Sequence, residues 1–272
     1  MEEIREIYDF YNTGAEIGRL ERGLGKIEFY RTKEIIKPYL TSPKTIYDVG
    51  GGVGKYSNWL ACLGHCVHLL ELAPAAVEYA QKNQDTDHPY LTEICDARNI
   101  ARMDESADMV LLMGPLYHLQ NSQDRMQAIK EAYRVLKKGG QLFTTGISKF
   151  SSTTWAISTY GKENKYLDDP AYRAMIREEL SSGNHNRPKE HPHFIAKAYF
   201  HTPEQLQEEL ERAGFLTIKK CAIEGIIWYT PSLEEKWENA ASRETLLKII
   251  RMTESEDSVM GMSPHFMIVS KK

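Results

Sequence analysis

The sequence predicts an α/β fold in which a mostly parallel sheet carries helices on both faces. Three observations support this. Short runs of β-forming residues alternate with helix-periodic segments between residues 41 and 147, a glycine-rich turn joins the first strand to its helix, and residues 108–113 are apolar at nearly every position. A continuous apolar run is typical of a central parallel strand buried on both faces. The length of 272 residues suits one such domain with an added subdomain.

Composition and charge are those of an ordinary globular protein. Hydrophobic residues make up 42% of the chain and charged residues 26%. No apolar run approaches the about 18 residues of a membrane span, and the polar, acidic N-terminus is unlike a signal peptide. We therefore expect a cytoplasmic protein with no membrane partner. The formal net charge of -4 argues against a nucleic-acid partner, because such binding draws on phosphate neutralisation.

The four cysteines, Cys62, Cys66, Cys95 and Cys221, form no C-x-x-C pair. We expect them to be small buried apolar residues, and we expect neither a disulfide framework nor a metal site.

Residues 1–40 have apolar residues at helix-like spacings, interrupted by Gly14, Gly18, Gly23 and Gly25. Glycine is a poor helix former, so this segment is predicted to be helical but broken and mobile.

The first strand and the turn after it predict a nucleotide site. Residues 45–49 are β-formers, and Gly50, Gly52 and Gly54 then lead into a helix-periodic segment. Glycine tolerates positive φ and lets the backbone approach a ligand at a helix N-terminus. A second strand at 65–70 ends at Glu71, roughly 20 residues beyond the turn, where an acid can accept hydrogen bonds from both hydroxyls of a ribose.

The next elements continue the βα alternation. Residues 75–83 are predicted to be helical, residues 90–95 form a third strand ending at Asp96 and Ala97, and residues 108–113 form the fourth. Residues 122–136 form a helix with Ser122 as its cap and Gly139 and Gly140 at its end.

The alternation stops at residues 148–200, which are rich in Ser, Thr, Tyr and His and include a helix-like stretch at 169–181. This segment is too long for a plain crossover, so we expect an inserted cap over the active site. His191 and His193 are interpreted as solvated loop residues rather than metal ligands. His193, Tyr199 and His201 are candidates for the substrate pocket.

The C-terminal part returns to the sheet. Thr202, Pro203 and Gln205 predict a helix start with a capping box. Residues 216–227 are predicted to form a strand, residues 233–254 a helix, and residues 265–270 the last strand.

Four ordered motifs resemble those of class I S-adenosylmethionine-dependent methyltransferases: Asp48 to Gly54, Leu70 to Pro74, Asp96 with Ala97, and Arg134 to Phe143. The resemblance implies a Rossmann-like, seven-stranded sheet whose last strand is antiparallel, with a helical cap. It also implies S-adenosylmethionine as methyl donor and S-adenosylhomocysteine as product. The cofactor-binding residues that it implies are Asp48, Gly50, Gly52, Gly54, Glu71, Asp96, Ala97 and Met113.

The resemblance also divides the chain. Residues 1–40 would be an N-terminal lid, with Tyr8, Tyr11, Arg19 and Arg31 as candidates to line the pocket. Of these, Tyr11 and Arg31 are the candidates to bind substrate. Residues 41–147 would hold the cofactor and residues 148–200 would form the cap. Residues 201–272 would complete the Rossmann-like domain, with a helical insertion at about 231–258.

The residues after the fourth strand bear on the acceptor. Gly114-Pro-Leu-Tyr-His-Leu119 departs from the Asp/Asn-Pro-Pro-Tyr motif of amino-methyltransferases at Gly114 and Leu116. It is more similar to the Leu-Tyr-His-Leu segment of small-molecule methyltransferases. Tyr117 and His118 are therefore the candidate catalytic residues. His118 either takes a proton from the acceptor or is a packed histidine that shapes the pocket.

We predict methyl transfer to an oxygen, nitrogen or sulfur of a small-molecule acceptor. The alternatives are an RNA or protein methyltransferase, or a non-catalytic protein that binds S-adenosylmethionine. A homodimer is left open.

Overall fold

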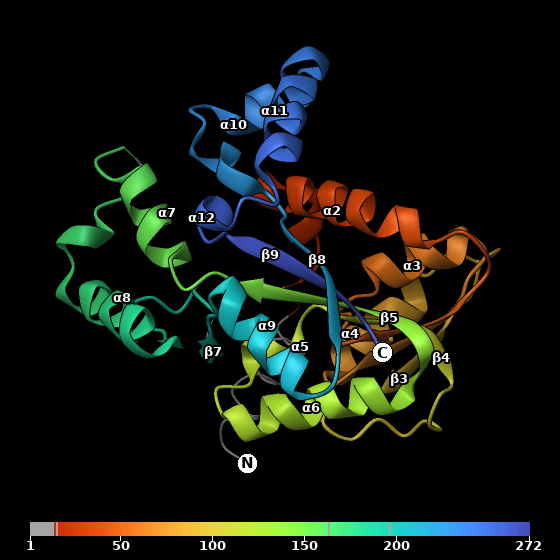
Figure 1. The fold of residues 1–272 in the computed structure, drawn as a ribbon. Helices are drawn as coiled ribbons and strands as arrows, with labels where there is room; N and C mark the ends of the chain where they lie inside the picture. The colour runs from red at the N-terminus through yellow and green to blue at the C-terminus, as the bar shows by residue number, and fades with distance from the viewer. Residues whose placement is uncertain (1–13, 15, 163, 196) are drawn as a thin grey trace.

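The computed structural model describes residues 14, 16–162, 164–195 and 197–272. Its centre is a seven-stranded sheet in the order β3-β2-β1-β4-β5-β9-β8 (Figure 1). β1 to β5 pair in parallel, and β9 is antiparallel to both β5 and β8, which confirms the predicted architecture. The strands are β1 (Thr45–Val49), β2 (Cys66–Glu71), β3 (Leu91–Ile94), β4 (Ala107–Leu112), β5 (Leu136–Ile147), β8 (Leu216–Ala222) and β9 (His265–Lys271).

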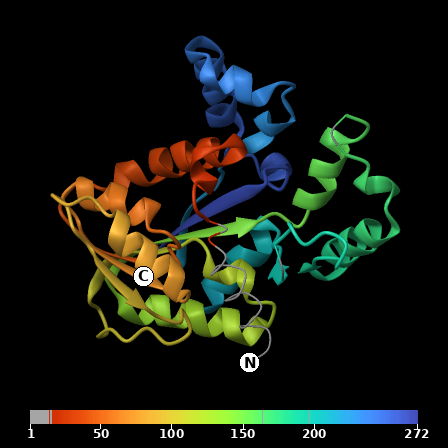
Figure 2. The same ribbon diagram turned by 180° about the vertical axis from the view of Figure 1, so that it is seen from behind.

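Helices cover both faces of the sheet because side chains alternate along each strand. Ile46 and Leu69 face the side covered by α2 (Gly23–Ile36), α3 (Lys55–Cys62) and α4 (Pro74–Asn83). Tyr47 and Leu70 face the side covered by α6 (Ser122–Val135) and α9 (Pro203–Arg212). Figures 1 and 2 show the two helical layers from opposite directions. The short helix α5 (Pro115–His118) follows β4, and the turn η2 (Lys37–Tyr39) follows α2.

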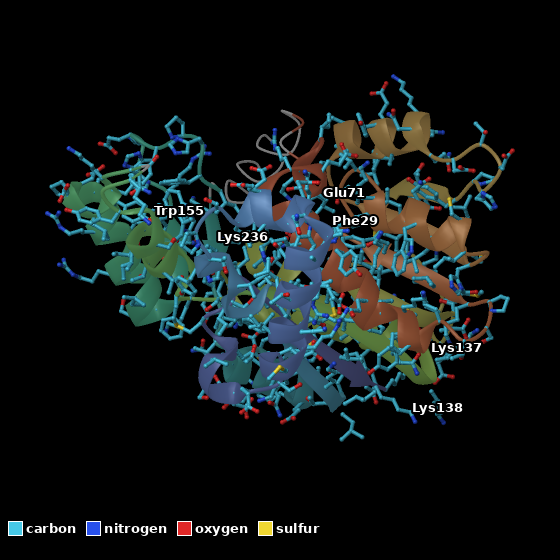
Figure 3. All side chains as sticks on the ribbon, turned by 90° about the horizontal axis from the view of Figure 1, so that it is seen from above. Phe29, Glu71, Lys137, Lys138, Trp155 and Lys236 are labelled. Atoms are coloured by element: carbon cyan, nitrogen blue, oxygen red, sulfur yellow. The ribbon has the colours of Figure 1, made fainter. Side chains whose placement is uncertain are left out.

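Residues 148–200 form a lobe at one side of the sheet domain, as Figures 1 and 2 show. The lobe has its own apolar cluster around Ala156, Tyr172 and Met175. Figure 3 shows Trp155 in this lobe, to one side of Glu71. The backbone N–H of His201 donates to the carbonyl of Ile147 at 2.9 Å, so the lobe leaves and rejoins the domain at one place. Its elements are α7 (Ser151–Thr159), η3 (Tyr166–Asp168), α8 (Pro170–Ser182), β6 (Asn184–Asn186) and β7 (Lys197–Tyr199).

A second group of helices is formed by the chain segment that connects β8 to β9, and it packs against α2. Ile27 of α2 shares an apolar cluster with Trp237, Leu247 and Ile250. The group consists of η4 (Gly225–Tyr229), α10 (Leu233–Glu238), α11 (Ala240–Thr253) and α12 (Asp257–Met260). None of the helices that the structure describes is long and apolar enough to span a bilayer.

Several predicted boundaries are wrong for local reasons. The strand predicted at 216–227 ends at Ala222, because the chain turns at Gly225, which has a φ of 61°. The helix predicted at 233–254 divides at Asn239, whose side chain accepts from the backbone N–H of Ser242 and so starts α11. Asn121, not Ser122, caps α6. The capping box of α9, from Thr202 and Gln205, is confirmed.

The glycines of residues 14–40 act differently from the prediction. Gly23 and Gly25 begin a continuous 14-residue helix instead of breaking one. A Cβ at Gly25 would lie 2.1 Å from the carbonyl oxygen of Arg19. Glycine there permits the close approach of α2 to the preceding turn η1 (Arg19–Glu21).

The prediction that all four cysteines are buried is also wrong. Cys62 and Cys66 are exposed, Cys95 is partly buried and Cys221 is buried. Cys62 is the last residue of α3 and Cys66 the first of β2, so both lie where an element meets solvent.

Candidate cofactor and acceptor site

A cavity lies at the carboxyl edge of the parallel strands, where ligands bind in open α/β sheets. Its walls come from the loops after β1, β2, β3 and β4, from residues 16–32, and from the region where β5 and β9 meet. The predicted residues that line it are Asp48, Gly50, Gly52, Glu71, Asp96, Ala97, Met113, Tyr117 and His118.

The glycine-rich loop forms one wall of this cavity. Gly50, Gly52 and Gly54 have φ values of 69°, 56° and 77°, a region that favours glycine. A Cβ at Gly50 would lie 2.5 Å from the Cγ atom of Pro115. Gly54 does not line the cavity. It precedes α3, and a Cβ there would lie 2.3 Å from the Tyr90 hydroxyl, so its role in the structure is packing.

Glu71 is buried at the end of β2 and holds the loop in place. One of its oxygens accepts from the backbone N–H of Gly52, and the other accepts from that of Ala73, both at 2.9 Å. Burial raises the pKa of this carboxyl above its ordinary value, although these hydrogen bonds oppose the shift. Each oxygen keeps a lone pair with which it can accept a further hydrogen bond from a ligand.

Asp48 is buried at the end of β1. Its carboxylate accepts from the Ser57 hydroxyl at 2.7 Å. Burial raises its pKa to about 6, the Ser57 hydrogen bond opposes the rise, and the nearby Glu71 adds to it. Asp48 therefore titrates in the range where most carboxyl groups are already ionised.

Asp48→Asn is expected to raise the unfolding temperature at pH 8 more than at pH 5. Because the folded-state pKa of Asp48 is raised, folding becomes less favourable as pH increases from the unfolded value of about 3.9 to about 6. The amide removes this cost and can still accept the Ser57 hydrogen bond. Calorimetry of the unliganded protein at the two pH values tests this, and an equal shift at both would contradict it.

Asp96 and Ala97 line the cavity after β3, with a neighbour that the sequence reasoning missed. Arg98 donates from Nη2 to Asp96 at 2.6 Å and from Nη1 to Asp124 at 3.0 Å. Although burial opposes the shift, hydrogen bonds from Arg98 lower the pKa of Asp96. Asp96 is thus held as a carboxylate at the cavity wall. The arginine two residues after Asp96 is the signal in the sequence that could have revealed this ion pair.

Tyr117 and His118 belong to α5, which follows β4, and both line the cavity. Their rings are 4.7 Å apart. Burial lowers the pKa of His118 to about 4, so this imidazole is neutral at pH 7 and is a weak base. Its environment favours the packed alternative over proton transfer. Burial also raises the pKa of Tyr117, which keeps its hydroxyl protonated.

A charged network lies at the cavity wall, and of its residues the sequence reasoning identified only Arg19. Arg19 pairs with Glu28 through both terminal nitrogens, at 2.5 and 3.0 Å, and with Glu16 at 2.7 Å. The His265 Nδ1 atom lies 2.7 Å from Glu224 and 4.0 Å from Glu28. Glu28, Glu224 and His265 are close enough to share a metal ion, with ligand atoms within 4.8 Å. Because Arg19 and the imidazole already engage these carboxylates, we interpret the group as an ion-pair network.

Four candidate substrate residues lie outside the cavity in this structure. Arg31 is buried against α11, where it pairs with Glu34 and Glu254. His193 contacts the Tyr166 hydroxyl within the lateral lobe, and His201 pairs with Glu209 beneath Tyr199. Tyr8 and Tyr11 lie outside the described residues.

The lateral lobe does not form the expected cap in this structure. No described residue of 148–200 lines the cavity. Its aromatic residues pack on one another, and β7 contacts α5. The aromatic and histidine content that suggested a pocket wall instead forms the lobe's own core.

Comparisons with known proteins agree with this geometry. Residues 47–144 match the methyltransferase domain family. The probable tRNA methyltransferase 9B of Bos taurus is 29% identical over 156 residues, which are 54% of this chain and 30% of that protein. The ubiquinone/menaquinone biosynthesis C-methyltransferase UbiE of Acidiphilium cryptum is 24% identical over 218 residues, which are 78% of this chain and 82% of that protein.

Solved structures share the fold. The crystal structure of a SAM-dependent methyltransferase from Methanosarcina mazei has a TM-score of 0.59 and 22% identity, and the match covers 88% of this chain and 96% of that one. The chain matches less than a third of the length of its tRNA methyltransferase 9B relatives. The domain match, the ordered motifs and the sheet topology together identify residues 47–144 as a methyltransferase domain of the class I, S-adenosylmethionine-dependent type.

Proposed function

We propose that this protein transfers the methyl group of S-adenosylmethionine to a heteroatom of a small-molecule acceptor. One observation carries the proposal: the cavity that three of the four motifs line is also lined by polar groups from Arg19, Glu28 and His265, which form its acceptor end. A cavity with a few polar groups beside the donor residues suits a compact acceptor more than a polymer.

The residues present fit the donor. Glu71 would accept hydrogen bonds from the ribose, Asp96 and the backbone of Ala97 would hold the adenine, and Asp48 would orient the methionine portion. At Gly50 a side chain would collide with Pro115, so the loop backbone forms the wall there. When bound, S-adenosylmethionine supplies a methyl group on a positively charged sulfur.

The protein's tasks are then alignment and exclusion of water. Met113 and Tyr117 also line the cavity, where they would position the acceptor against the methyl group. In this proposal residues 41–147 hold the donor, while residues 16–32 and the start of β9 form the acceptor end. The boundaries at residues 40, 147 and 200 stay predictions.

A tRNA acceptor is the second candidate, because the chain resembles proteins named probable tRNA methyltransferase 9B. Charges near the glycine-rich loop favour the small molecule. Lys55 there pairs with Glu21, and Arg19 pairs with two acids, so both cations are already neutralised. Assays of methyl transfer to bulk tRNA and to a metabolite extract would separate the two candidates.

Glu71→Ala is expected to weaken binding of S-adenosylmethionine and S-adenosylhomocysteine at least tenfold, or about 1.4 kcal/mol. The substitution removes the ribose acceptor and frees the backbone N–H groups of Gly52 and Ala73 that position the loop. Isothermal titration calorimetry measures the change.

Glu93→Ala is the matched control for this experiment. Glu93 lies on the neighbouring strand β3, pairs with Arg102 at the surface and does not line the cavity. This variant should bind both ligands as the parent does. A folded parent protein that binds neither ligand would overturn the proposed function.

A further inference from the structure

The topology of the sheet brings Glu224 and His265 to the acceptor end of the cavity. Because β9 is antiparallel, its first residue, His265, pairs with Ile147, the last residue of β5. Glu224 follows β8, the other neighbour of β9. Both residues therefore lie at the carboxyl edge where the donor site is built, although they are far in sequence from its motifs.

Glu224 fixes the His265 ring. Its carboxylate is fully buried and lies 2.7 Å from Nδ1 of that ring. It also accepts from the backbone N–H of His265 at 3.0 Å and from the Ser263 hydroxyl at 3.1 Å. A carboxylate can only accept, so Nδ1 carries a proton. Nε2 is left to contact a ligand, and within the described ranges it has no hydrogen-bond partner.

The charges around this ring favour its protonated form. Burial lowers its pKa, and Arg19 acts in the same direction, but Glu224 and Glu28 outweigh both and raise the pKa of His265 to about 9. The groups that face it are thus Glu224 from the loop after β8, Glu28 from α2 and Arg19 from η1. His118, the only other histidine among the described residues that line the cavity, is a far weaker base.

The part of the cavity around His265 suits an aromatic acceptor. Leu20, Tyr56, Tyr117 and Ile223 line the same cavity and present apolar or aromatic surface. Pockets of this kind bind a flat ring and use a few polar groups to orient it. A hydroxyl on such a ring ionises at about the same pH as His265, because the phenol of tyrosine has an ordinary pKa of about 10.

We propose that Glu224 and His265 act together to hold a phenol-type acceptor as its phenolate beside the methyl donor. This inference rests on the proposed function and adds its substrate class and the residues that ionise it. The hydroxyl proton passes to solvent as the acceptor binds, and the Nε2–H of the imidazolium donates to the phenolate oxygen. That oxygen attacks the methyl carbon, and the carbon–sulfur bond breaks with its electron pair on sulfur. The negative charge of the phenolate cancels the positive charge of the sulfonium, and His265 keeps its proton.

Binding of 4-nitrophenol to protein saturated with S-adenosylhomocysteine tests the proposal, because only the phenolate of this probe is coloured. An imidazolium at Nε2 should hold the probe as its phenolate, so that the bound probe ionises at least one pH unit below the free one. His265→Gln should remove this shift and weaken phenolate binding at least tenfold. Glu224→Gln keeps the His265 ring but should reduce the shift in the ionisation of the bound probe. This second variant tests the proposal if His265→Gln does not fold.

His88→Gln is the matched control. His88 also lies beside a carboxylate, with Nδ1 3.0 Å from Asp85, but it is 47% exposed and outside the cavity. It should leave the shift unchanged. The proposal is overturned if protein that binds S-adenosylhomocysteine fails to bind the probe, leaves its ionisation unshifted, or loses the shift with His118→Gln and not with His265→Gln. Loss of S-adenosylhomocysteine binding by the parent would instead refute the proposed function.

Discussion

Arg125→Met is expected to lower the free energy of unfolding by about 3–5 kcal/mol, the cost of removing one partner from a buried ion pair. Arg125 is buried and donates to Glu209 from Nη2 at 2.8 Å. It also donates to the carbonyls of Leu119 and Gln120, at 2.9 and 2.8 Å, and lies 3.7 Å from the centroid of the Tyr199 ring. It thus joins α6, α9, the end of α5 and the lateral lobe. Methionine fills the space but leaves these acceptors unpaired.

Urea unfolding at pH 7 measures this loss, and pH provides an internal check. Although burial opposes the shift, hydrogen bonds from His201 and Arg125 lower the pKa of Glu209 to about 2. The stabilisation from this lowered pKa is present above the unfolded value of about 4.3 and is lost as pH falls toward 2. The difference between variant and parent should therefore shrink at pH 3.

Arg251→Met is the control for Arg125→Met. Arg251 pairs with Glu34 and Glu244, but its side chain is 39% exposed. Ion pairs of this kind contribute about 0–1 kcal/mol. If the two variants lose similar stability, the buried pair does not have the role assigned to it.

Gly50→Val is expected to lower the affinity for S-adenosylhomocysteine by about 100-fold or more while the fold is retained. At a φ of 69° a residue with a Cβ is strained by about 1–2 kcal/mol. A side chain would also meet Pro115 Cγ at 2.5 Å, and such overpacking costs about 1–3 kcal/mol. The loop must move to relieve both, and Pro115 and Gly50 both line the cavity.

Gly64→Val separates the cost of backbone strain at positive φ from the cost of the side-chain collision. Gly64 has a φ of 85°, but a Cβ there would meet nothing within 4 Å. This variant should lose stability and keep its affinity. Calorimetric titration of both variants, with circular dichroism to verify folding, makes the comparison. Equal affinities would show that the contact between Gly50 and Pro115 does not shape the site.

The donor half of the site could be predicted because its residues follow one another in the chain. Asp48 and Glu71 each end a strand, and parallel strands place their ends at one edge, so a local pattern fixes a local geometry. The fold class was predictable for the same reason. Gly54 shows the limit of prediction from local motifs. The motif implied its positive φ, but it did not imply that Tyr90 packs against it.

The acceptor half depends on contacts between distant segments, which periodicity does not reveal. Glu28 and His265 are separated by most of the chain and meet because α2 covers the edge where β9 begins. Arg31 has the same residue type as Arg19, yet it faces Glu254 and not the cavity. Arg19 belongs to the turn η1 and Arg31 to α2, and the glycines around residue 25 obscured where that helix starts.

The lateral lobe leaves and rejoins the sheet domain at one place, which makes it a modular insertion. Its two ends are held together by the hydrogen bond between His201 and Ile147, and its apolar cluster is its own. Evolution can therefore lengthen, shorten or exchange residues 148–200 without altering the register of β5 or the start of α9. Related chains can thus diverge in what they recognise outside the cavity while the donor site remains constant.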